Sequence, residues 1–419
     1  MTTVKNNLIT NVSAEAIKDS RGIDTIKVTV SVGKISDSFS VPSGASTGKY
    51  EAHELRDDGT SHGGVTKAIK IIETRIKNLL VGMDVTDQRE IDAQLCMTDG
   101  TRYKLVLGGN SIIGASIASA KVAAKVKGME LCKYLRTLDP EMKPSLNKNP
   151  YLYINLINGG KHAVSPIAFQ EYHLVPDVGT LDEAIKIGLA VQKELKKLIE
   201  ETQTVKYGDE GGFAIEDNDV LKPLDLLVKA IENTNNKGKC FVALDVAASS
   251  FYNEKEGSYT VGCNQLNKDQ LITLYKKIEK DYPLISIEDP FHEEDFESFA
   301  ELQKHMRRVR IVGDDLTVTN VNRLEKAIEI KSITGIIIKP NQIGTLTETI
   351  DAMKIARNNH VDCIVSHRSG ETMDDFIADL AYAFQAFGVK AGAFGPKERE
   401  VKYTRLKEIS KELENEITS

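Results

Sequence analysis

Charged and imidazole side chains stand at the ends of short apolar segments throughout the second half of the chain. One example is the segment Gly-Ile-Ile-Ile, which is followed directly by a lysine. The residues placed in this way are Asp245, Glu288, Asp314, Lys339, His367 and Lys390. Carboxylates, amines and an imidazole that meet in one pocket can bind a cation and transfer protons. The pattern therefore predicts an active site that several strand ends build together.

Asp245, Glu288 and Asp314 supply three carboxylates from three successive segments. An all-oxygen set of this kind suits a hard divalent cation, above all Mg²⁺. The alternative interpretation is that each carboxylate only caps the amino end of a following helix. A zinc site is not indicated, because Phe296 stands where a second histidine would follow His292 and the cysteines form no Cys-x-x-Cys pair.

Lys339 ends an apolar segment, so we expect its amine to face the same pocket. Burial and nearby divalent cations both disfavour the protonated amine, which allows a lysine to act as a general base near neutral pH. The alternative is a structural lysine that forms an ion pair with the carboxylates.

Two acids lie in loops between the apolar segments. Glu210 lies in Gly-Asp-Glu-Gly-Gly, and Gln170 and Glu171 follow the apolar run 167–169. Two acids in one site can separate into a proton donor and a charged partner when their environments differ.

A further group of side chains suits an anionic ligand. Arg368 and Ser369 directly follow His367, and a guanidinium and a hydroxyl beside an imidazole suit a phosphate monoester. His162 follows Asn-Gly-Gly-Lys, where it is either a substrate contact or a structural residue of the loop.

The loop 42–49 is rich in Gly and Ser and ends in a lysine. It does not fit a nucleotide phosphate loop, because Ser43 stands where the first glycine belongs and Tyr50 follows the lysine. We interpret it as a mobile lid in which Ser46 offers an oxygen to a metal, with an inert connection as the alternative.

The elements that must position these residues follow from the spacing. Each apolar segment and the stretch after it has the length of one strand plus one helix, which is typical of a (β/α)₈ barrel with its site at the carboxyl ends of the strands. We expect this barrel over residues 151–419. Residues 139–150, rich in proline and asparagine, are expected to be a linker.

The first part of the chain has a different order of elements. Apolar residues alternate over 25–32, the period of a half-buried strand, and a second strand is expected over 35–41. Helical periodicity follows over 68–80, and a helix rich in Ala and Gly is expected over 111–127. Strands followed by helices indicate an α+β domain, which we place at residues 1–138 as a cap on the barrel.

Composition limits the class of protein. The chain has 419 residues and a formal net charge of −7, whereas nucleic-acid scaffolds usually have a basic excess. No run of 18 apolar residues and no signal peptide is evident. Five cysteines far apart in sequence indicate reduced thiols. We therefore expect a cytoplasmic protein without a membrane span and without a nucleic-acid partner.

Several longer motifs together resemble the enolase family (phosphopyruvate hydratases), in family order and over residues 20–400. These motifs are Ser20-Arg21-Gly22, residues 42–48, Gln170-Glu171, residues 208–212, Ser286-Ile287-Glu288-Asp289-Pro290, Gly313-Asp314-Asp315-Leu316, Asn341-Gln342-Ile343-Gly344 and residues 366–372. Sites of this superfamily combine a Lys or His base with one or two Mg²⁺ ions.

The resemblance implies reversible dehydration of 2-phospho-D-glycerate to phosphoenolpyruvate in glycolysis and gluconeogenesis, with two Mg²⁺ ions per site. It implies that Lys339 removes the C2 proton and that Glu210 assists hydroxide loss, with Glu171 and His367 in the catalytic set. The implied metal ligands are Asp245, Glu288, Asp314 and, for the second ion, Ser46. The implied substrate-binding residues are His162, Gln170, Glu171, Glu288, Asp314, Lys339, Arg368, Ser369 and Lys390. It also implies a homo-oligomer, either a dimer or an octamer.

The chain departs from the family pattern at several positions. These departures are Ile23-Asp24, Val164-Ser165, Ser250, Pro340 and residues 394–400. They leave two alternatives open: a binding or adhesion protein that keeps the fold without the activity, and another superfamily enzyme such as an acid-sugar dehydratase. Retention of every acid, lysine and histidine disfavours the first, and the expected phosphate ligands Arg368, Ser369 and Lys390 disfavour the second.

Overall fold

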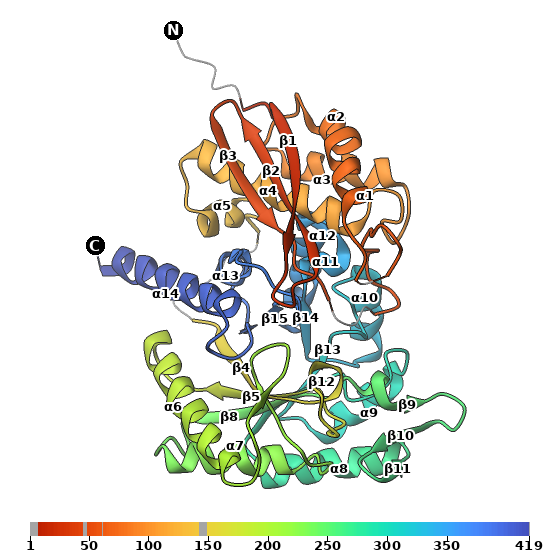
Figure 1. Cartoon of the computed structure of the whole chain (residues 1–419), viewed down its shortest axis with the longest axis vertical. Helices are drawn as coiled ribbons and strands as arrows, with labels where there is room; N and C mark the ends of the chain where they lie inside the picture. Colours follow the sequence, from red (N-terminus) through yellow and green to blue (C-terminus); the bar gives the residue numbers. More distant parts are fainter. Residues whose placement is uncertain (1–6, 45–47, 61, 142–148, 419) are drawn as a thin grey trace.

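The chain folds into an amino-terminal α+β part that lies against the rim of a carboxy-terminal barrel (Figure 1). The computed structural model describes residues 7–418 except 45–47, 61 and 142–148. Elements of the first part are β1 (Asn11–Lys18), β2 (Asp24–Val32), β3 (Ile35–Ser40), α1 (Thr66–Ile71), η1 (Ile72–Ile76), α2 (Lys77–Leu80), α3 (Gln88–Asp99), α4 (Gly109–Lys127) and α5 (Leu131–Thr137).

Helix α4 packs closely on the antiparallel sheet β1-β2-β3. Gly114 makes this approach possible, because a Cβ atom there would lie only 2.4 Å from Cγ2 of Val28. The alternation predicted for residues 25–32 is confirmed, since Ile26, Val28, Val30 and Val32 are all buried in β2. The sheet thus presents one apolar face to the helices.

Eight strands close the barrel. In spatial order they are β4 (Tyr151–Asn158), β5 (Glu171–Pro176), β8 (Cys240–Asp245), β12 (Leu284–Glu288), β13 (Arg310–Gly313), β14 (Gly335–Ile338), β15 (Asp362–Ser366) and β16 (Gly388–Lys390). Pairing of β16 with β4 completes the circle. The predicted class, a barrel capped by an α+β domain, is confirmed. The linker at 139–150 stays a prediction.

Strand β5 runs antiparallel to both of its neighbours, β4 and β8, whereas the other barrel pairs are parallel. The physical reason lies in the connection 159–170, because a parallel return needs a crossover helix and this loop contains only a short 3₁₀ turn, η2 (Gly160–His162). Consequently the amino end of β5, not its carboxyl end, lies at the rim. Glu171, expected in a loop after the apolar run 167–169, is instead the first residue of the strand.

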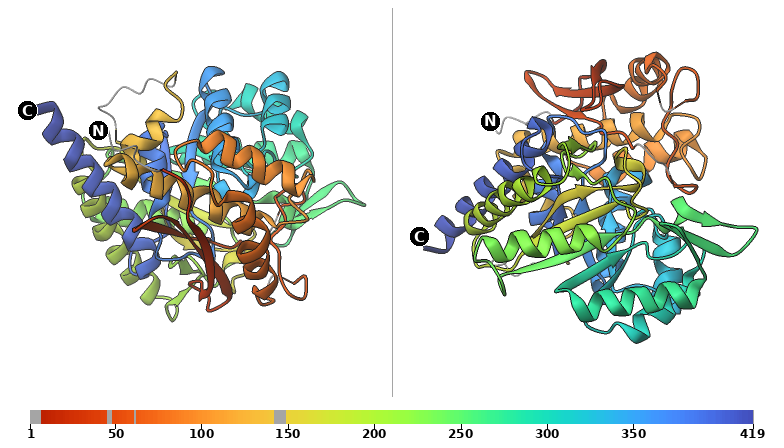
Figure 2. Two further views of the ribbon diagram at one scale, coloured as in Figure 1. Left: turned by 90° about the horizontal axis from the view of Figure 1, so that it is seen from above. Right: turned by 60° about the horizontal axis from the view of Figure 1, so that its bottom comes forward.

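Helices surround the barrel and return the chain between strands. They are α6 (Leu181–Glu200), α7 (Lys222–Asn233), α8 (Lys268–Asp281), α9 (Phe296–His305), α10 (Val321–Ile330), α11 (Pro340–Ile343), α12 (Leu346–Asn358), α13 (Phe376–Ala383) and α14 (Lys397–Thr418). Smaller elements are β6 (Lys206–Tyr207), β7 (Phe213–Ala214), η3 (Ala248–Phe251), β9 (Tyr252–Asn253), β10 (Ser258–Val261) and β11 (Asn264–Leu266). The last helix, α14, lies against α6 and α13 at the side of the barrel (Figure 2).

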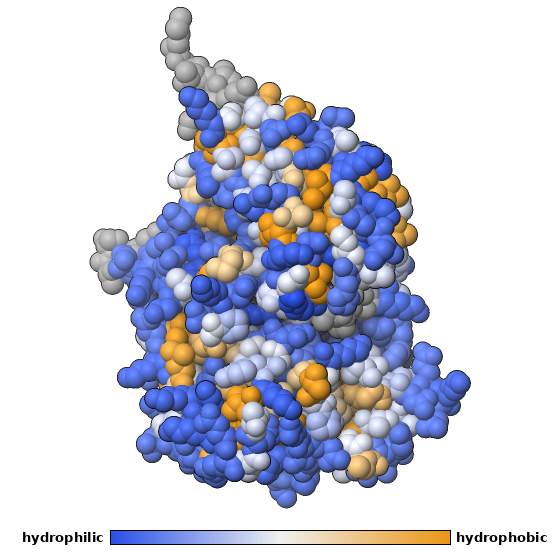
Figure 3. Space-filling view, viewed as in Figure 1, coloured by the Kyte–Doolittle hydropathy of each residue, from blue (hydrophilic) through white to orange (hydrophobic). Residues whose placement is uncertain are grey.

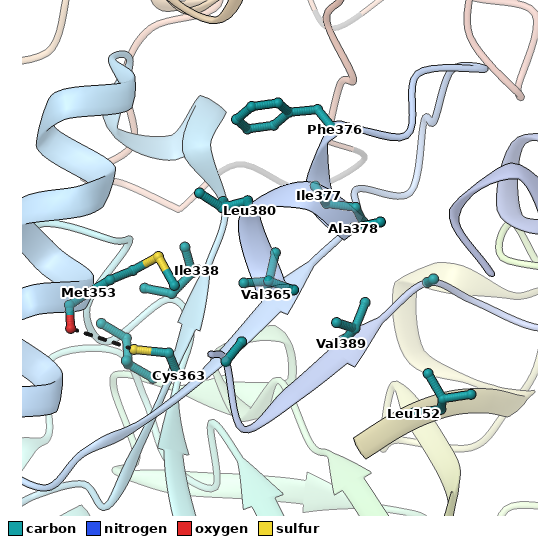
Figure 4. Packing of buried hydrophobic residues seen from close by; sticks show 14 of the residues in the cluster. Leu152, Ile338, Met353, Cys363, Val365, Phe376, Ile377, Ala378, Leu380 and Val389 are labelled. Carbon is teal, nitrogen blue, oxygen red and sulfur yellow. Dashed lines mark hydrogen bonds between the residues drawn. The ribbon is translucent and has the colours of Figure 1, made fainter. Parts of the chain in front are cut away.

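The barrel has an inner and an outer apolar layer. Ile337 and Ile364 point inward and join Tyr153, Val175 and other residues in a cluster that fills the barrel. Neighbouring positions such as Ile338, Val365 and Val389 face the helices, where they meet Met353 and Leu380 (Figure 4). This alternation holds the strand ends in place, so the side chains at the rim project from a rigid base.

Contacts between the two parts cross the rim. Lys104 pairs with Glu348 at 3.0 Å, and Lys121 pairs with Asp374 at 2.9 Å. A β-bridge joins Ser43 to Gly370. The face of the molecule in Figure 3 is mostly hydrophilic with scattered apolar residues. No helix among the residues that the structure describes is long and apolar enough to cross a membrane.

Candidate active site

A polar pocket of about 290 Å³ opens at the rim of the barrel, and Gly44, Gly48, Lys49 and Glu51 of the amino-terminal part also line it. Its described wall contains eight carboxylates: Glu51, Glu171, Glu210, Asp245, Asp289, Glu293, Asp314 and Asp315. It contains five lysine or arginine side chains: Lys49, Lys161, Lys339, Arg368 and Lys390. Carboxyl groups therefore outnumber lysine and arginine side chains in the described wall of this pocket.

Lys390 joins three of the predicted acids. Its Nζ lies 2.8 Å from Oε2 of Glu288, 3.0 Å from Oε2 of Glu171 and 3.4 Å from Oδ2 of Asp245. Gln170 donates from Nε2 to the same oxygen of Asp245 at 3.3 Å. Glu288 lies beneath Lys390 and is not part of the pocket wall. All these side chains are buried, so their charges interact strongly.

Asp314 and Lys339 form a second ion pair at the rim, with Nζ of the lysine against Oδ2 of the aspartate. Gln342 donates from Nε2 to the other carboxylate oxygen at 3.0 Å. Burial lowers the pKa of Lys339, but the attraction of Asp314, Glu288 and other neighbouring groups together outweighs burial, and the pKa is raised. In the protein without a ligand this lysine is therefore a charged partner of Asp314.

Burial and mutual repulsion raise the pKa of Asp245 and raise that of Glu288 well above its ordinary value, in spite of Lys390. Burial raises the pKa of Asp315 to about 8, and repulsion by Asp314 adds to this effect. The lysine and arginine side chains thus do not fully offset the repulsion among these acids. An all-oxygen set with excess negative charge is suited to a divalent cation.

Two groups among the described residues bring ligand atoms within 4.8 Å of one another and could hold a metal ion. They are His162 with Glu171 and Glu210, and Asp289 with Asp314 and Asp315. Asp314 thus belongs to one such group, whereas Asp245 and Glu288 meet at the amine of Lys390. Ser46, predicted as a ligand, lies outside the described residues.

Glu210 and Glu171 face one another beside two histidines. Nδ1 of His162 lies 2.9 Å from Oε1 of Glu171 and 3.5 Å from Oε1 of Glu210. Nε2 of His367 lies 3.0 Å from Oε2 of Glu210, and Asn155 donates to that oxygen at 2.9 Å. Burial and Glu171 tend to raise the pKa of Glu210, but His367 and His162 outweigh them and lower it to about 2.

Arg368 crosses from the barrel to the amino-terminal part. Its Nη1 donates to Oε2 of Glu51 at 2.9 Å and to Oδ1 of Asn341 at 3.1 Å. Ser369 also lines the pocket. The guanidinium predicted to bind a phosphate is thus held by a carboxylate in this structure.

The structure brings the described predicted residues into one region and adds others that were not among the predicted site residues. Asn155 and Gln342 contact Glu210 and Asp314, and Glu51 contacts Arg368. Arg399 reaches the loop after β15 from the first turn of α14. The sequence did not indicate a place for Arg399 near the site, because a charged helix is usually expected to lie on the outer surface of a protein.

Pro340 and Val164 show how two of the sequence departures fit the fold. Pro340 occupies the first turn of α11, where a missing N–H costs no helical hydrogen bond. Val164 lies in the loop 159–170 with its side chain 97% exposed, so it lies outside the cluster of acids.

The fold and the site define a barrel with a carboxylate-rich pocket at its rim, an arrangement typical of barrel enzymes. The sequence model described as "Enolase, C-terminal TIM barrel domain" matches residues 148–418, and "Enolase, N-terminal domain" matches residues 9–135. The enolase of Pyrococcus furiosus is 44% identical over 415 residues, covering 97% of this chain and 95% of the relative. Those of Thermococcus kodakarensis and Methanopyrus kandleri are 43% and 42% identical, each over 97% of this chain and 95% and 96% of the relative.

The chain belongs to the enolase family. This family consists of metal-dependent hydro-lyases of glycolysis, and the chain is an enzyme of this kind.

Proposed function

We propose that the chain catalyses the reversible dehydration of 2-phospho-D-glycerate to phosphoenolpyruvate, with Mg²⁺ as its metal. The observation that supports this most strongly is the excess of carboxylates in the pocket wall. A substrate with a phosphate and a carboxylate would be repelled from such a pocket unless cations entered with it. Family membership and pocket charge thus lead to the same metal-dependent reaction.

In this proposal Asp245, Glu288 and Asp314 hold the first Mg²⁺ and Ser46 contributes to a second. Their all-oxygen chemistry fits this hard cation. When bound, these ions would supply positive charge that stabilises negative charge on the substrate carboxylate and that opposes the attraction of Asp314 for the proton of Lys339.

Lys339 removes the proton from C2, so the C–H electron pair passes into the substrate and the amine becomes an ammonium. Its place at the end of β14, buried beside Asp314, supports this role. The C3–O bond then breaks and the hydroxyl leaves. A proton delivered to that hydroxyl releases water, which balances the reaction.

Glu210 supplies this second proton in our proposal, with Glu171 beside it. In the free protein the lowered pKa keeps Glu210 ionised. The negative charges of the bound substrate raise the pKa of a neighbouring carboxyl group. Glu210 therefore takes up a proton as the substrate binds and donates it as hydroxide leaves.

The remaining predicted contacts recognise the two anionic ends of the substrate. His162, Gln170, Arg368, Ser369 and Lys390 all line the pocket, which supports this assignment. A guanidinium and a hydroxyl suit the phosphate, since charged hydrogen bonds to phosphate are strong and directional. His367 also lines the pocket, with its Nε2 atom 3.0 Å from Oε2 of Glu210.

We also propose that the amino-terminal cap comprises residues 1–138, the linker 139–150 and the catalytic barrel 151–419. Further proposals are assembly into a dimer or an octamer and a location in the cytoplasm. Free thiols at all five cysteines support a reducing compartment.

The test of the proposed function uses the purified chain and 2-phosphoglycerate. With Mg²⁺ the ultraviolet absorbance of the enol product should rise, and dialysis against a chelator should abolish the rise until Mg²⁺ returns. Full turnover in metal-free buffer would contradict the assigned metal ligands. Absence of turnover with Mg²⁺ and intact protein would contradict the substrate.

A further inference from the structure

The guanidinium of Arg399 lies fully buried behind the candidate active site. It comes from the first turn of α14 and donates to the carbonyl oxygens of the loop that follows β15. Nη1 donates to the oxygen of Arg368 at 2.7 Å, and Nη2 donates to those of Ser369 at 2.6 Å and Asp209 at 3.4 Å. The end of the chain thus holds two rim loops together.

The same guanidinium also contacts His367. Nη1 of Arg399 lies 2.5 Å from Nδ1 of the imidazole. An arginine has only donors and stays protonated in proteins, so Nδ1 must accept this hydrogen bond. A proton on Nδ1 would point at the N–H of the arginine. The neutral ring must therefore have its proton on Nε2.

Nε2 of His367 faces the proposed acid. It lies 3.0 Å from Oε2 of Glu210, at hydrogen-bond distance although the N–H is not aimed straight at the oxygen. Asn155 donates to the same oxygen. With its proton on Nε2, His367 can only donate toward this carboxylate. Arg399 thus donates to His367, and the N–H of His367 faces Glu210, the final acceptor.

The electrostatics of the cluster agree with a neutral ring. Burial lowers the pKa of His367, Glu210 opposes this and Arg399 lowers it further, so the net shift is downward. Packing leaves the ring little freedom, because a Cβ atom at Gly392 would lie 3.1 Å from Cε1 of His367 and 3.0 Å from Cδ of Arg399.

We propose that Arg399 is a positioning residue that fixes His367 as the neutral Nε2–H tautomer. In this form His367 orients Glu210 by directing its N–H toward the carboxylate, and it does not itself transfer a proton in the reaction. The consequence for catalysis rests on the proposed role of Glu210. The tautomer itself does not depend on the substrate or on turnover.

The direct test is ¹⁵N NMR of the full chain labelled in histidine, with the His367→Gln variant to assign the signals. We expect His367 to show a protonated Nε2 and an unprotonated Nδ1 from about pH 7 to about pH 9, without titration. A wild-type His367 that is protonated on Nδ1, or that becomes an imidazolium in this range, would overturn the proposal.

Variants separate positioning from general support of the loop. Arg399→Met removes every donor, and Arg399→Lys restores one. Lys402→Met is the matched control, because Lys402 is a buried cation of the same helix that pairs with Glu371 of the same loop at 2.7 Å and does not contact His367. A merely structural role predicts the same behaviour for Arg399→Met and Lys402→Met.

We expect Arg399→Met, but not Lys402→Met, to let His367 titrate or change tautomer. Its kcat should fall about 10- to 100-fold with little change in KM, the usual cost of losing a group that orients a catalytic residue. Arg399→Lys should recover part of the loss. Unchanged His367 signals in Arg399→Met would contradict the proposal. If Arg399→Met does not fold, the wild-type spectrum alone tests the proposed tautomer. If His367 shows the Nε2–H tautomer but the wild-type protein has no turnover, only the proposed function is refuted.

Discussion

The carboxylate of Glu51 forms an ion pair with Arg368, whose guanidinium we propose binds the substrate phosphate. The substrate must therefore compete with Glu51 for this guanidinium. Oε2 of Glu51 accepts from Nη1 of Arg368 at 2.9 Å. The side chains are only 6% and 5% exposed, so water screens this pair weakly. We predict that Glu51→Gln, which keeps the shape of the side chain and removes its charge, strengthens substrate binding.

The magnitude follows from the kind of hydrogen bond. A hydrogen bond from the charged guanidinium contributes about 1.5–3 kcal/mol, and an amide acceptor lies at the lower end of this range because the attraction between opposite charges is lost. Exchange of the carboxylate for an amide therefore weakens the competing contact by about 1–1.5 kcal/mol. Every 1.4 kcal/mol is tenfold in affinity, so KM should fall by about 5- to 10-fold.

Steady-state kinetics with 2-phosphoglycerate at saturating Mg²⁺ measure this effect, with kcat followed in parallel. Glu54→Gln is the control, because Glu54 pairs with Arg56 at 2.7 Å and acts on Arg368 only through longer-range attraction. The control should change KM much less than Glu51→Gln does. An unchanged KM in Glu51→Gln would show that Glu51 does not compete with the phosphate, and a raised KM would show that it helps to orient Arg368.

Three further predictions concern binding, pH and packing. Arg368→Ala should raise KM by about 10- to 100-fold while thermal melting changes less; a large loss in melting temperature with unchanged kinetics would make Arg368 structural. Because the pKa of Glu210 is lowered to about 2, its ionised carboxylate stabilises the fold above about pH 4.5, and this contribution is lost as pH falls to about 2. In urea melts, the free energy of unfolding of Glu210→Gln should therefore decrease less on acidification than that of the wild type. Gly114→Ala should lower stability by about 1–3 kcal/mol through its clash with Val28, whereas Gly179→Ala, which meets no atom within 4 Å, should not.

The apolar segments of the second half predicted the barrel strands closely. Strand β14 covers Gly335–Ile338 and β15 covers Asp362–Ser366, so Lys339 and His367 stand at the carboxyl ends where the spacing placed them. This worked because a strand buried on both faces is a continuous apolar run, and its first polar residue marks the rim. The period of the β2 segment was equally informative, since one of its faces is buried.

The direction of a strand and the tertiary contacts of a side chain could not be predicted in the same way. An antiparallel strand such as β5 has the same apolar pattern as a parallel one, so only the length of loop 159–170 distinguishes them. The contact of Arg399 with His367 joins residues far apart in sequence through two loops. Glu51 likewise meets Arg368 only because the two parts of the chain pack together. Pairings of this kind are set by tertiary packing, which local patterns do not contain.

The central claim is the division of labour between Lys339 as base and Glu210 as acid, and exchange of the C2 proton in deuterated water tests it most directly. NMR of 2-phosphoglycerate with Mg²⁺ follows exchange and dehydration together for each variant. Lys339→Ala should lose both. Glu210→Gln keeps the lysine, so exchange should continue while phosphoenolpyruvate formation falls by about 10²–10⁴-fold, the usual contribution of one acid–base group. Exchange that survives in Lys339→Ala, or dehydration that continues undiminished in Glu210→Gln, would contradict this assignment.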